Sequence, residues 1–294
     1  MSNSKHPLSN VLGKKIKASY VFIQRLVQDR RALIGSLILL CTFVAAILAP
    51  EIAPYDPSMS SGPRLAPPSI KYPLGTDNFG RDVFSRVIYG SRISLYVGSI
   101  SVSIAFLLGV PLGMIAGYYK GYLDEGIMRL IDAMLTFPPL LIALIIMASL
   151  GSNLRNVLIA LGFVYTPFFA RVTRSATLSI VNEDYISAAH IRGETNFYIL
   201  FKEVLPNIIA PLVVQISLTF AFAILAESAL SFLGMGTQPP TPSWGLMIQE
   251  GKLYLQEAPW LIFGPGSAIA VVVFASNILG DALRDILDAK EGIR

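Results

Sequence analysis

The chain has 294 residues, of which 53% are hydrophobic and only 14% are charged, and its formal net charge is +4. Soluble globular domains carry roughly a quarter charged residues, so this composition argues against a soluble fold and points to lipid as the solvent. A single cysteine excludes an internal disulfide, and the two histidines have no partners at metal-ligand spacing. No basic stripe with interleaved aromatic residues suggests nucleic-acid binding.

Six stretches between charged residues are candidate membrane spans, because a spanning helix needs about 20 mostly apolar residues. They are residues 32–50, 93–119, 133–154, 156–170, 204–226 and 258–280. The fourth is short, and we expect it to use the stem of Arg171 to reach the interface. The sequence therefore predicts an all-α membrane protein with six transmembrane helices.

The distribution of Lys and Arg predicts the orientation. Segments 1–31, 118–132, 171–206 and 281–294 hold most of these residues, which by the positive-inside rule makes both termini cytoplasmic. The long loop 50–92 is an exception, but long loops obey the rule weakly. The predicted organisation is a cytoplasmic segment 1–31, a first transmembrane helix 32–50, an external loop 51–92, a five-helix core 93–280 and a cytoplasmic tail 281–294.

The external loop begins with a Pro-rich stretch and continues with four charged residues at helical spacing: Asp77, Arg81, Asp82 and Arg86. We expect Thr76 or Asp77 to cap an interfacial helix that begins near Phe79. One interpretation is a solvated helix whose charges pair with one another. The other is a contact for a protein that delivers substrate.

Two features mark the next spans. Gly109, Gly113, Gly117 and Gly121 repeat every four residues, an interval that allows close helix packing in lipid. Pro111 lies within this row and should bend the helix, so a hinge is the alternative to a purely structural role. Pro138-Pro139 interrupts the third span, and its freed carbonyls should face protein or a water-filled cavity.

Two acidic residues flank or interrupt the apolar stretches. We expect Asp132 to pair with Arg129 at the cytoplasmic interface. Glu227 is the one carboxylate well inside an apolar context. Ionisable residues within a membrane are functional candidates, but Glu227 lies near the outer end of its span. Lining of a pathway and structural pairing therefore both remain open.

Residues 171–206 form the longest predicted cytoplasmic connection between spans, and they are not Pro-rich, so we expect residues 182–206 within them to be folded. Asn182 can cap a helix that runs to about Arg192, where Gly193 breaks it. A second helical stretch then reaches Leu205, and Pro206 suits the first turn of the next span. The prediction is a two-helix elbow, which on physical grounds is either an interfacial amphipathic segment or a docking site.

Ala188 and Ala189 would leave a shallow surface on this elbow. Ser187-Ala188-Ala189, with Gly193 and Leu205-Pro206, resembles the Glu-Ala-Ala/Gly/Leu-Pro signature of bacterial ABC importer permeases, although Ser187 stands where many members have Glu. In that family the loop docks into the ATPase subunit. The resemblance implies that the coupling residues are Ser187, Ala188, Ala189, His190, Gly193, Leu205 and Pro206.

A second resemblance is more specific. Residues 74–86 and 90–95, together with 227–234, 239–245 and 280–285, are similar to motifs of the C-type permease subunits of dipeptide/oligopeptide and nickel importers. This implies a type I ABC importer permease fold in a bacterial or archaeal inner membrane. The implied partners are a second permease subunit in a heterodimer, one or two ATP-binding subunits and an extracytoplasmic substrate-binding protein. Glu227, Asp77 and Arg81 are candidates for pathway or external contacts.

The sequence disfavours an enzyme. It has no phosphate-binding loop, no nucleophile elbow and no zinc-binding helix, so ATP and Mg would be bound by partner chains and this chain would carry no cofactor. A secondary transporter would need membrane-buried coupling charges or inverted repeats, and neither is evident. The expected function is therefore ATP-driven import of di- or oligopeptides. Import of nickel or another small solute is the alternative.

Overall fold

The computed structural model describes residues 26–291, and the parts of the predicted terminal segments at 1–25 and 292–294 lie outside this range. Within the described range the only β-type pairing is an isolated bridge between Thr76 and Asp82. The rest of the regular structure is helical. The helices are α2 (Arg30–Ile47), α3 (Ala49–Ile52), α4 (Val83–Tyr119), α5 (Gly121–Leu135), α6 (Pro139–Leu150), α7 (Leu154–Ile180), α8 (Asp184–Ile191), α9 (Asn196–Tyr198), α10 (Leu205–Asn207), α11 (Ile209–Phe232), α12 (Trp244–Gly251) and α13 (Trp260–Glu291), with a π-helical turn at Ile199–Val204 and a 3₁₀ turn at Lys252–Tyr254.

Five of these helices (α2, α4, α7, α11 and α13) are each long and apolar enough to cross a membrane. The pair α5–α6, bent by 86° at the break that contains Pro138, is a sixth crossing when it is counted as one broken span. The prediction of six spans is therefore confirmed, with the third span broken. Pro138 has no N–H and fixes its own φ, which is why the chain leaves helical geometry there.

Three of these helices extend well beyond the predicted spans: α4, α7 and α13. The second span, α4, begins at Val83 and has 37 residues, about 55 Å of helix, because Asp82 caps its first turn. The expected short fourth span is wrong, since α7 continues to Ile180. Beyond the predicted end, Arg171 pairs with Asp132 of α5 at 2.6 Å, and Arg174 pairs with Asp124 one turn further on. The Arg171 side chain is more than half exposed, and arginine is a good helix former, so its charge does not end the helix.

The centre of the fold is the contact of α4 with α7, and α11, α13 and α2 pack in succession beside it. Gly109, Gly113 and Gly117 face α7 so closely that a Cβ on Gly109 would fall 2.5 Å from the carbonyl oxygen of Thr166. The prediction of tight packing is confirmed for these three glycines. Gly121 differs, because a Cβ added there would have no neighbour within 4 Å. Its φ is positive, at the turn between α4 and α5.

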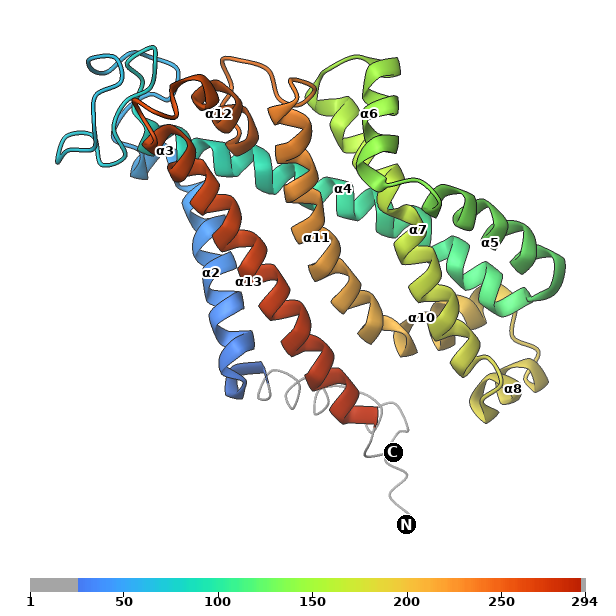
Figure 1. The fold of residues 1–294 in the computed structure, drawn as a ribbon. Helices are drawn as coiled ribbons and strands as arrows, with labels where there is room; N and C mark the ends of the chain where they lie inside the picture. Colours follow the sequence, from blue (N-terminus) through green and yellow to red (C-terminus); the bar gives the residue numbers. More distant parts are fainter. Residues whose placement is uncertain (1–25, 292–294) are drawn as a thin grey trace.

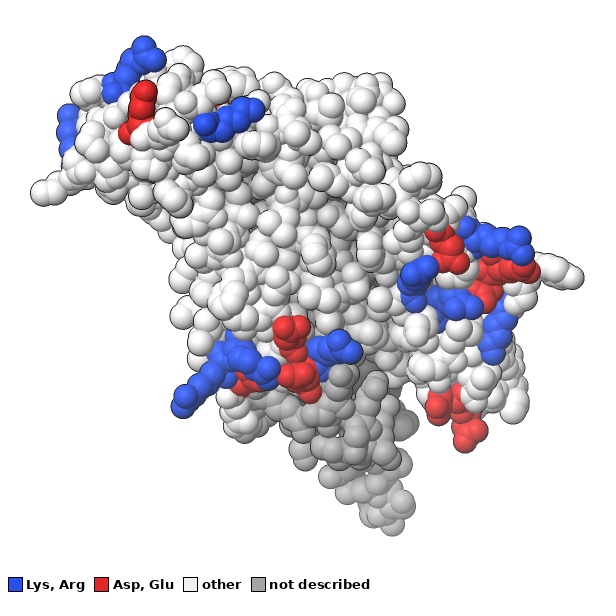
Figure 2. Space-filling view, in the orientation of Figure 1, with Lys and Arg blue, Asp and Glu red and all other residues white. Residues whose placement is uncertain are grey.

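The six crossings separate two ends of the molecule (Figure 1). One end holds α3, α12 and the loop between α3 and α4, and is called the α12 end; the other holds α8, α10, the start of α2 and the end of α13, and is called the α8 end. Figure 2 shows that the charged side chains of this face gather at the two ends, with an uncharged belt between them. This is the distribution that a hydrocarbon layer requires.

Candidate functional site

The elbow predicted at residues 182–206 is present at the α8 end (Figure 1), with boundaries slightly different from those expected. The helix α8 follows Glu183, and the Asn182 side chain accepts a hydrogen bond from Lys120 Nζ at 3.2 Å instead of capping the helix. Gly193 ends the helix with φ of +78°, a left-handed conformation that glycine adopts without strain. Its N–H donates to the carbonyl of His190 at 3.0 Å.

The second half of the elbow is less regular than predicted. Thr195 Oγ1 accepts a hydrogen bond from the Tyr198 N–H, and α9 then passes into the π-helical turn and α10. Leu205 and Pro206 belong to α10, and the following span begins only at Ile209. The expectation that Pro206 lies in the first turn of that span is therefore wrong. A proline in the first turn of α10 costs no hydrogen bond, which is why it is tolerated there.

The elbow exposes a surface of small and apolar side chains. Ser187 and Ala188 are exposed, but Ala189 is fully buried, so the expected shallow surface is formed by only one of the two alanines. Sequence reasoning missed the large side chains beside them, although two aromatic residues four positions apart in a polar connection are a recognisable signal. We call the following group the elbow surface: Ser187, Ala188, Ile191, Phe197 and Phe201.

Hydrogen bonds join the elbow to α4. Tyr118, in the last turn of α4, donates its hydroxyl proton to Asn196 Oδ1 at 3.0 Å, and the Tyr118 hydroxyl oxygen also lies 3.2 Å from His190 Nε2. The rings of Tyr118 and His190 also stack. Because α4 runs from one end of the molecule to the other, a force on the elbow reaches the longest helix of the bundle directly.

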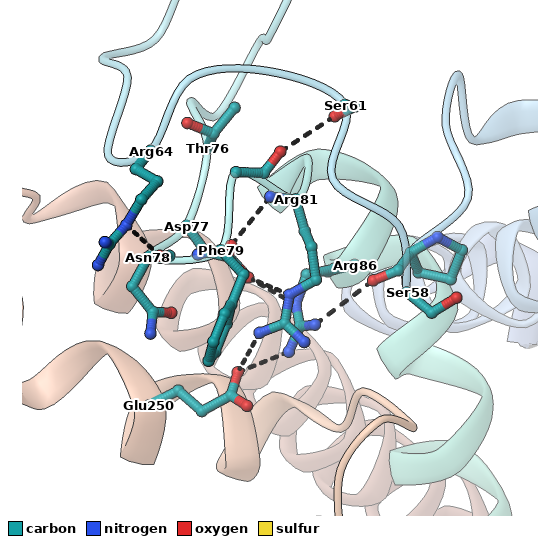
Figure 3. A network of polar contacts seen from close by, with 12 residues as sticks. Ser58, Ser61, Arg64, Thr76, Asp77, Asn78, Phe79, Arg81, Arg86 and Glu250 are labelled. Atoms are coloured by element: carbon teal, nitrogen blue, oxygen red, sulfur yellow. Dashed lines mark hydrogen bonds and ion pairs between the residues drawn. The ribbon is translucent and has the colours of Figure 1, made fainter.

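At the α12 end, charged residues form a buried cluster (Figure 3). Arg81 contacts Asp77 at 2.6 Å and Glu250 at 3.2 Å, and Arg86 contacts Glu250 at 2.6 Å and Asp77 at 3.6 Å. We call these four residues the ionic ring. Two positive and two negative charges balance, and the Arg86 side chain is only 1% exposed. Sequence reasoning missed Glu250 because it lies far along the chain and no local pattern marks it.

The predicted solvated helix beginning near Phe79 is wrong. The helix begins at Val83 because the Asp82 carboxylate accepts a hydrogen bond from the Ser85 N–H at 2.7 Å. Asp77 instead stabilises a turn, since one of its carboxylate oxygens accepts from the N–H groups of Phe79 and Arg81. The Phe79 ring is 60% exposed and lies 4.7 Å from the Arg81 guanidinium. In this turn the aromatic ring is thus exposed, and the Asp77 and Arg81 side chains beneath it are buried.

Glu227 lies on α11 with no exposed surface. Its carboxylate accepts hydrogen bonds from the hydroxyls of Ser231, at 2.8 Å, and Ser94 of α4, at 3.3 Å. In the part of the chain that the structure describes, no ion pair includes Glu227. Of the two alternatives left by the sequence, the structure therefore favours pairing, with hydroxyl groups as the partners.

A further predicted pair is wrong: Asp132 contacts Arg171 of α7, and Arg129 pairs with Glu125 one helical turn before it. The i,i+4 spacing suits Arg129 and Glu125, and packing of α5 on α7 supplies the partner of Asp132. Pro138 and Pro139 line a mainly apolar cavity of about 620 Å³ between α6, α7 and α11. Among the described residues no group of three acidic, Cys or His side chains could hold a metal ion.

Six apolar crossings with charges confined to the two ends define a polytopic membrane protein. A solved structure of the MetNI methionine ABC transporter in an inward-facing conformation has the same fold, with a TM-score of 0.57 and 18% identity over 68% of this chain and 95% of that chain. The dipeptide transport system permease protein DppC of Alkalihalophilus pseudofirmus is 43% identical, covering 91% of this chain and 88% of that protein. The protein of the same description from Escherichia coli is 44% identical, covering 90% of each.

The family model described as the inner membrane component of binding-protein-dependent transport systems matches residues 109–292. The model of the N-terminal transmembrane domain of oligopeptide transport permease C matches residues 20–68. The chain belongs to the family of inner membrane components of binding-protein-dependent transport systems, as a multi-pass permease of the C type. The resemblance found in the sequence motifs is thereby confirmed.

Proposed function

We propose that the chain forms half of the translocation pathway of an ATP-driven importer of di- or oligopeptides. The observation that carries this proposal is the elbow surface, a set of exposed small and apolar side chains at the α8 end. Two other residues of the elbow, His190 and Asn196, contact the Tyr118 hydroxyl at the end of α4. Exposed apolar groups of this kind mark a site of protein contact. The names of the relatives support peptide as the cargo.

In this proposal both termini and the elbow are cytoplasmic, and one ATP-binding subunit docks on the elbow. Ser187 and Ala188 form the contact, Ala189 packs the elbow from within, and Gly193, Leu205 and Pro206 set its shape. His190 passes the movement to Tyr118. Closure of the ATPase pair then moves α4 and its neighbours as rigid bodies, which switches access to the pathway between the two sides. The ATPase pair offers a second docking cleft, which a second permease chain fills.

This chain contributes no catalytic residue and no cofactor, since ATP and Mg belong to the partner subunits. The cavity beside Pro138 and Pro139 would form part of the pathway, because non-helical backbone at membrane depth must face protein or water. At the opposite, extracytoplasmic end, Asp77 and Arg81 hold Phe79 outward as a contact for the substrate-binding protein. Their role is positioning, since both charged side chains are buried.

The test is uptake into proteoliposomes that contain this chain, the second permease, the ATPase subunits and the binding protein. We expect ATP-dependent accumulation of a radiolabelled dipeptide, abolished when either the binding protein or ATP is omitted. Accumulation of nickel without accumulation of peptide would support the alternative cargo. Uphill transport by this chain alone would refute the importer.

A further inference from the structure

Glu227 is the centre of a buried hydrogen-bond cluster that the proposed function does not use. Its carboxylate accepts from Ser231 on its own helix and from Ser94 on α4. The hydroxyl of Ser243, the residue before α12, lies beside this carboxylate. The three serines therefore come from three different parts of the fold: α11, α4 and the segment that precedes α12.

Each of these serines also accepts a hydrogen bond from a backbone N–H. Ser231 Oγ accepts from the N–H of Thr237 at 3.4 Å. Ser94 Oγ accepts from the N–H of Trp244 at 3.5 Å, and Ser243 Oγ caps α12 by accepting from the N–H of Leu246 at 3.3 Å. All three N–H groups belong to residues 233–251, which we call the α12 segment.

The carboxylate explains this arrangement. The oxygens of this carboxyl group accept the proton of a serine hydroxyl, which leaves the lone pairs of that hydroxyl free for a backbone N–H. One side chain thus orients the Ser94 and Ser231 acceptors for the α12 segment. In an apolar surrounding these bonds are stronger than in water, and an unsatisfied group is correspondingly unfavourable.

Close packing also holds the α12 segment against α11 and α4. A Cβ on Gly245 would fall 2.6 Å from the Cα of Ser228, so only glycine fits where α12 begins against α11. The Trp244 indole is almost fully buried and donates its Nε1–H to the carbonyl of Val87 on α4 at 2.9 Å. At the other end of α12, Glu250 belongs to the ionic ring. The α12 segment is therefore fixed to the spans at both of its ends.

We propose that Glu227 is a positioning residue whose carboxyl group, through Ser94 and Ser231, fastens the α12 segment to α4 and α11 so that the three move as one body during transport. The role during the transport cycle rests on the proposed function, whereas the fastening itself does not. The proposal also explains the sequence motifs at 90–95, 227–234 and 239–245, which the elbow and the ionic ring leave unused: they meet at this one carboxylate.

The test is the distance between spin labels on Leu107 of α4 and Leu253, just after α12, both of which are exposed. The labels are placed on cysteines in the assembled transporter, with Cys41→Ser as background. With Glu227 intact we expect one narrow distance distribution that is the same with and without ATP. A distance that shifts with nucleotide would overturn the proposal, and this arm requires no variant of the cluster.

Variants provide the second arm. Glu227→Leu should broaden the distribution and lower peptide uptake by at least about tenfold, while ATP hydrolysis continues, because two buried hydroxyls lose their acceptor. Glu227→Gln should keep most of the narrow distance distribution and most of the peptide uptake. Its amide oxygen still accepts a hydrogen bond, and its N–H₂ group can donate to a serine oxygen. Ser94→Ala is the milder variant should the leucine protein fail to fold. Ser103→Ala, whose hydroxyl bonds only within α4, is its matched control.

A narrow distance distribution in both Glu227→Leu and Ser94→Ala would refute the fastening. An equal loss of peptide uptake in the Glu227→Gln and Glu227→Leu variants would refute it too. The outcome is separable from failure of the proposed function. If the assembled transporter with Glu227 intact takes up no peptide, the importer is refuted, but the width of the label distribution still reports on the cluster.

Discussion

Removing one charge from the ionic ring should loosen the α12 end in a measurable way. Arg86→Met takes away the cation that contacts Glu250 at 2.6 Å and Asp77 at 3.6 Å. Breaking a buried ion pair by deleting one partner costs about 3–5 kcal/mol. Arg81 still contacts both carboxylates and Glu250 is 20% exposed, so we expect the lower limit, about 3 kcal/mol.

The assay is amide hydrogen exchange of residues 76–82 in the purified protein. The Asp77 N–H donates to the Arg81 carbonyl at 2.9 Å, and its exchange requires the loop to open. A loss of about 3 kcal/mol corresponds to exchange roughly 100-fold faster. Arg64→Met is the matched control on the same loop, because Arg64 is exposed and contacts only the carbonyl of Asn78.

A second substitution distinguishes lost charge balance from general damage. Arg86→Met combined with Glu250→Met leaves Arg81 with Asp77, a neutral pair, and replaces the rest by apolar side chains. Such replacements are often neutral in buried sites, so the double variant should regain most of the protection. The reasoning would be contradicted if amide exchange in Arg86→Met differed from that of the unmodified protein by less than about threefold. It would also be contradicted if exchange in the double variant were no slower than in Arg86→Met.

Three further predictions concern the elbow and the helix packing. Ala188→Arg should leave membrane insertion intact but uncouple ATP hydrolysis from uptake, with Ala188→Ser as control; unchanged uptake would exclude the docking role. Tyr118→Phe removes the hydroxyl that joins α4 to His190, and should lower uptake per ATP hydrolysed without affecting assembly. Gly113→Ala should destabilise the purified protein by about 1–3 kcal/mol in thermal unfolding, because a Cβ would meet the α7 backbone. Gly126→Ala, where no atom lies within 4 Å, is the matched control.

The local signals of the sequence predicted most of the fold. Runs of apolar residues predicted six crossings, and Gly193 and the spacing of Gly109, Gly113 and Gly117 predicted a helix break and a tight helix contact that the structure contains. These features depend on the chain's own backbone or on a periodic pattern, which a single sequence displays.

What the sequence could not predict depends on partners far along the chain. Charged residues at helical spacing indicated a solvated helix at Phe79, yet Asp77 and Arg81 are buried because Glu250 completes their charge balance from α12. Arg171 was expected at the end of a short span, but α7 continues to Ile180, and the Arg171 side chain is more than half exposed, so its charge does not oppose the helix. In the first case a tertiary contact overrides the local pattern, since a paired charge can remain buried where an unpaired one cannot.

The central claim is that the elbow faces the cytosol, where an ATPase can reach it. The most direct measurement is labelling of Ala188→Cys, in a Cys41→Ser background, by a maleimide that does not cross the membrane. We expect no labelling in intact cells and full labelling after the membrane is opened, whereas Leu253→Cys at the other end should react in intact cells. Reaction of Ala188→Cys in intact cells would contradict the account.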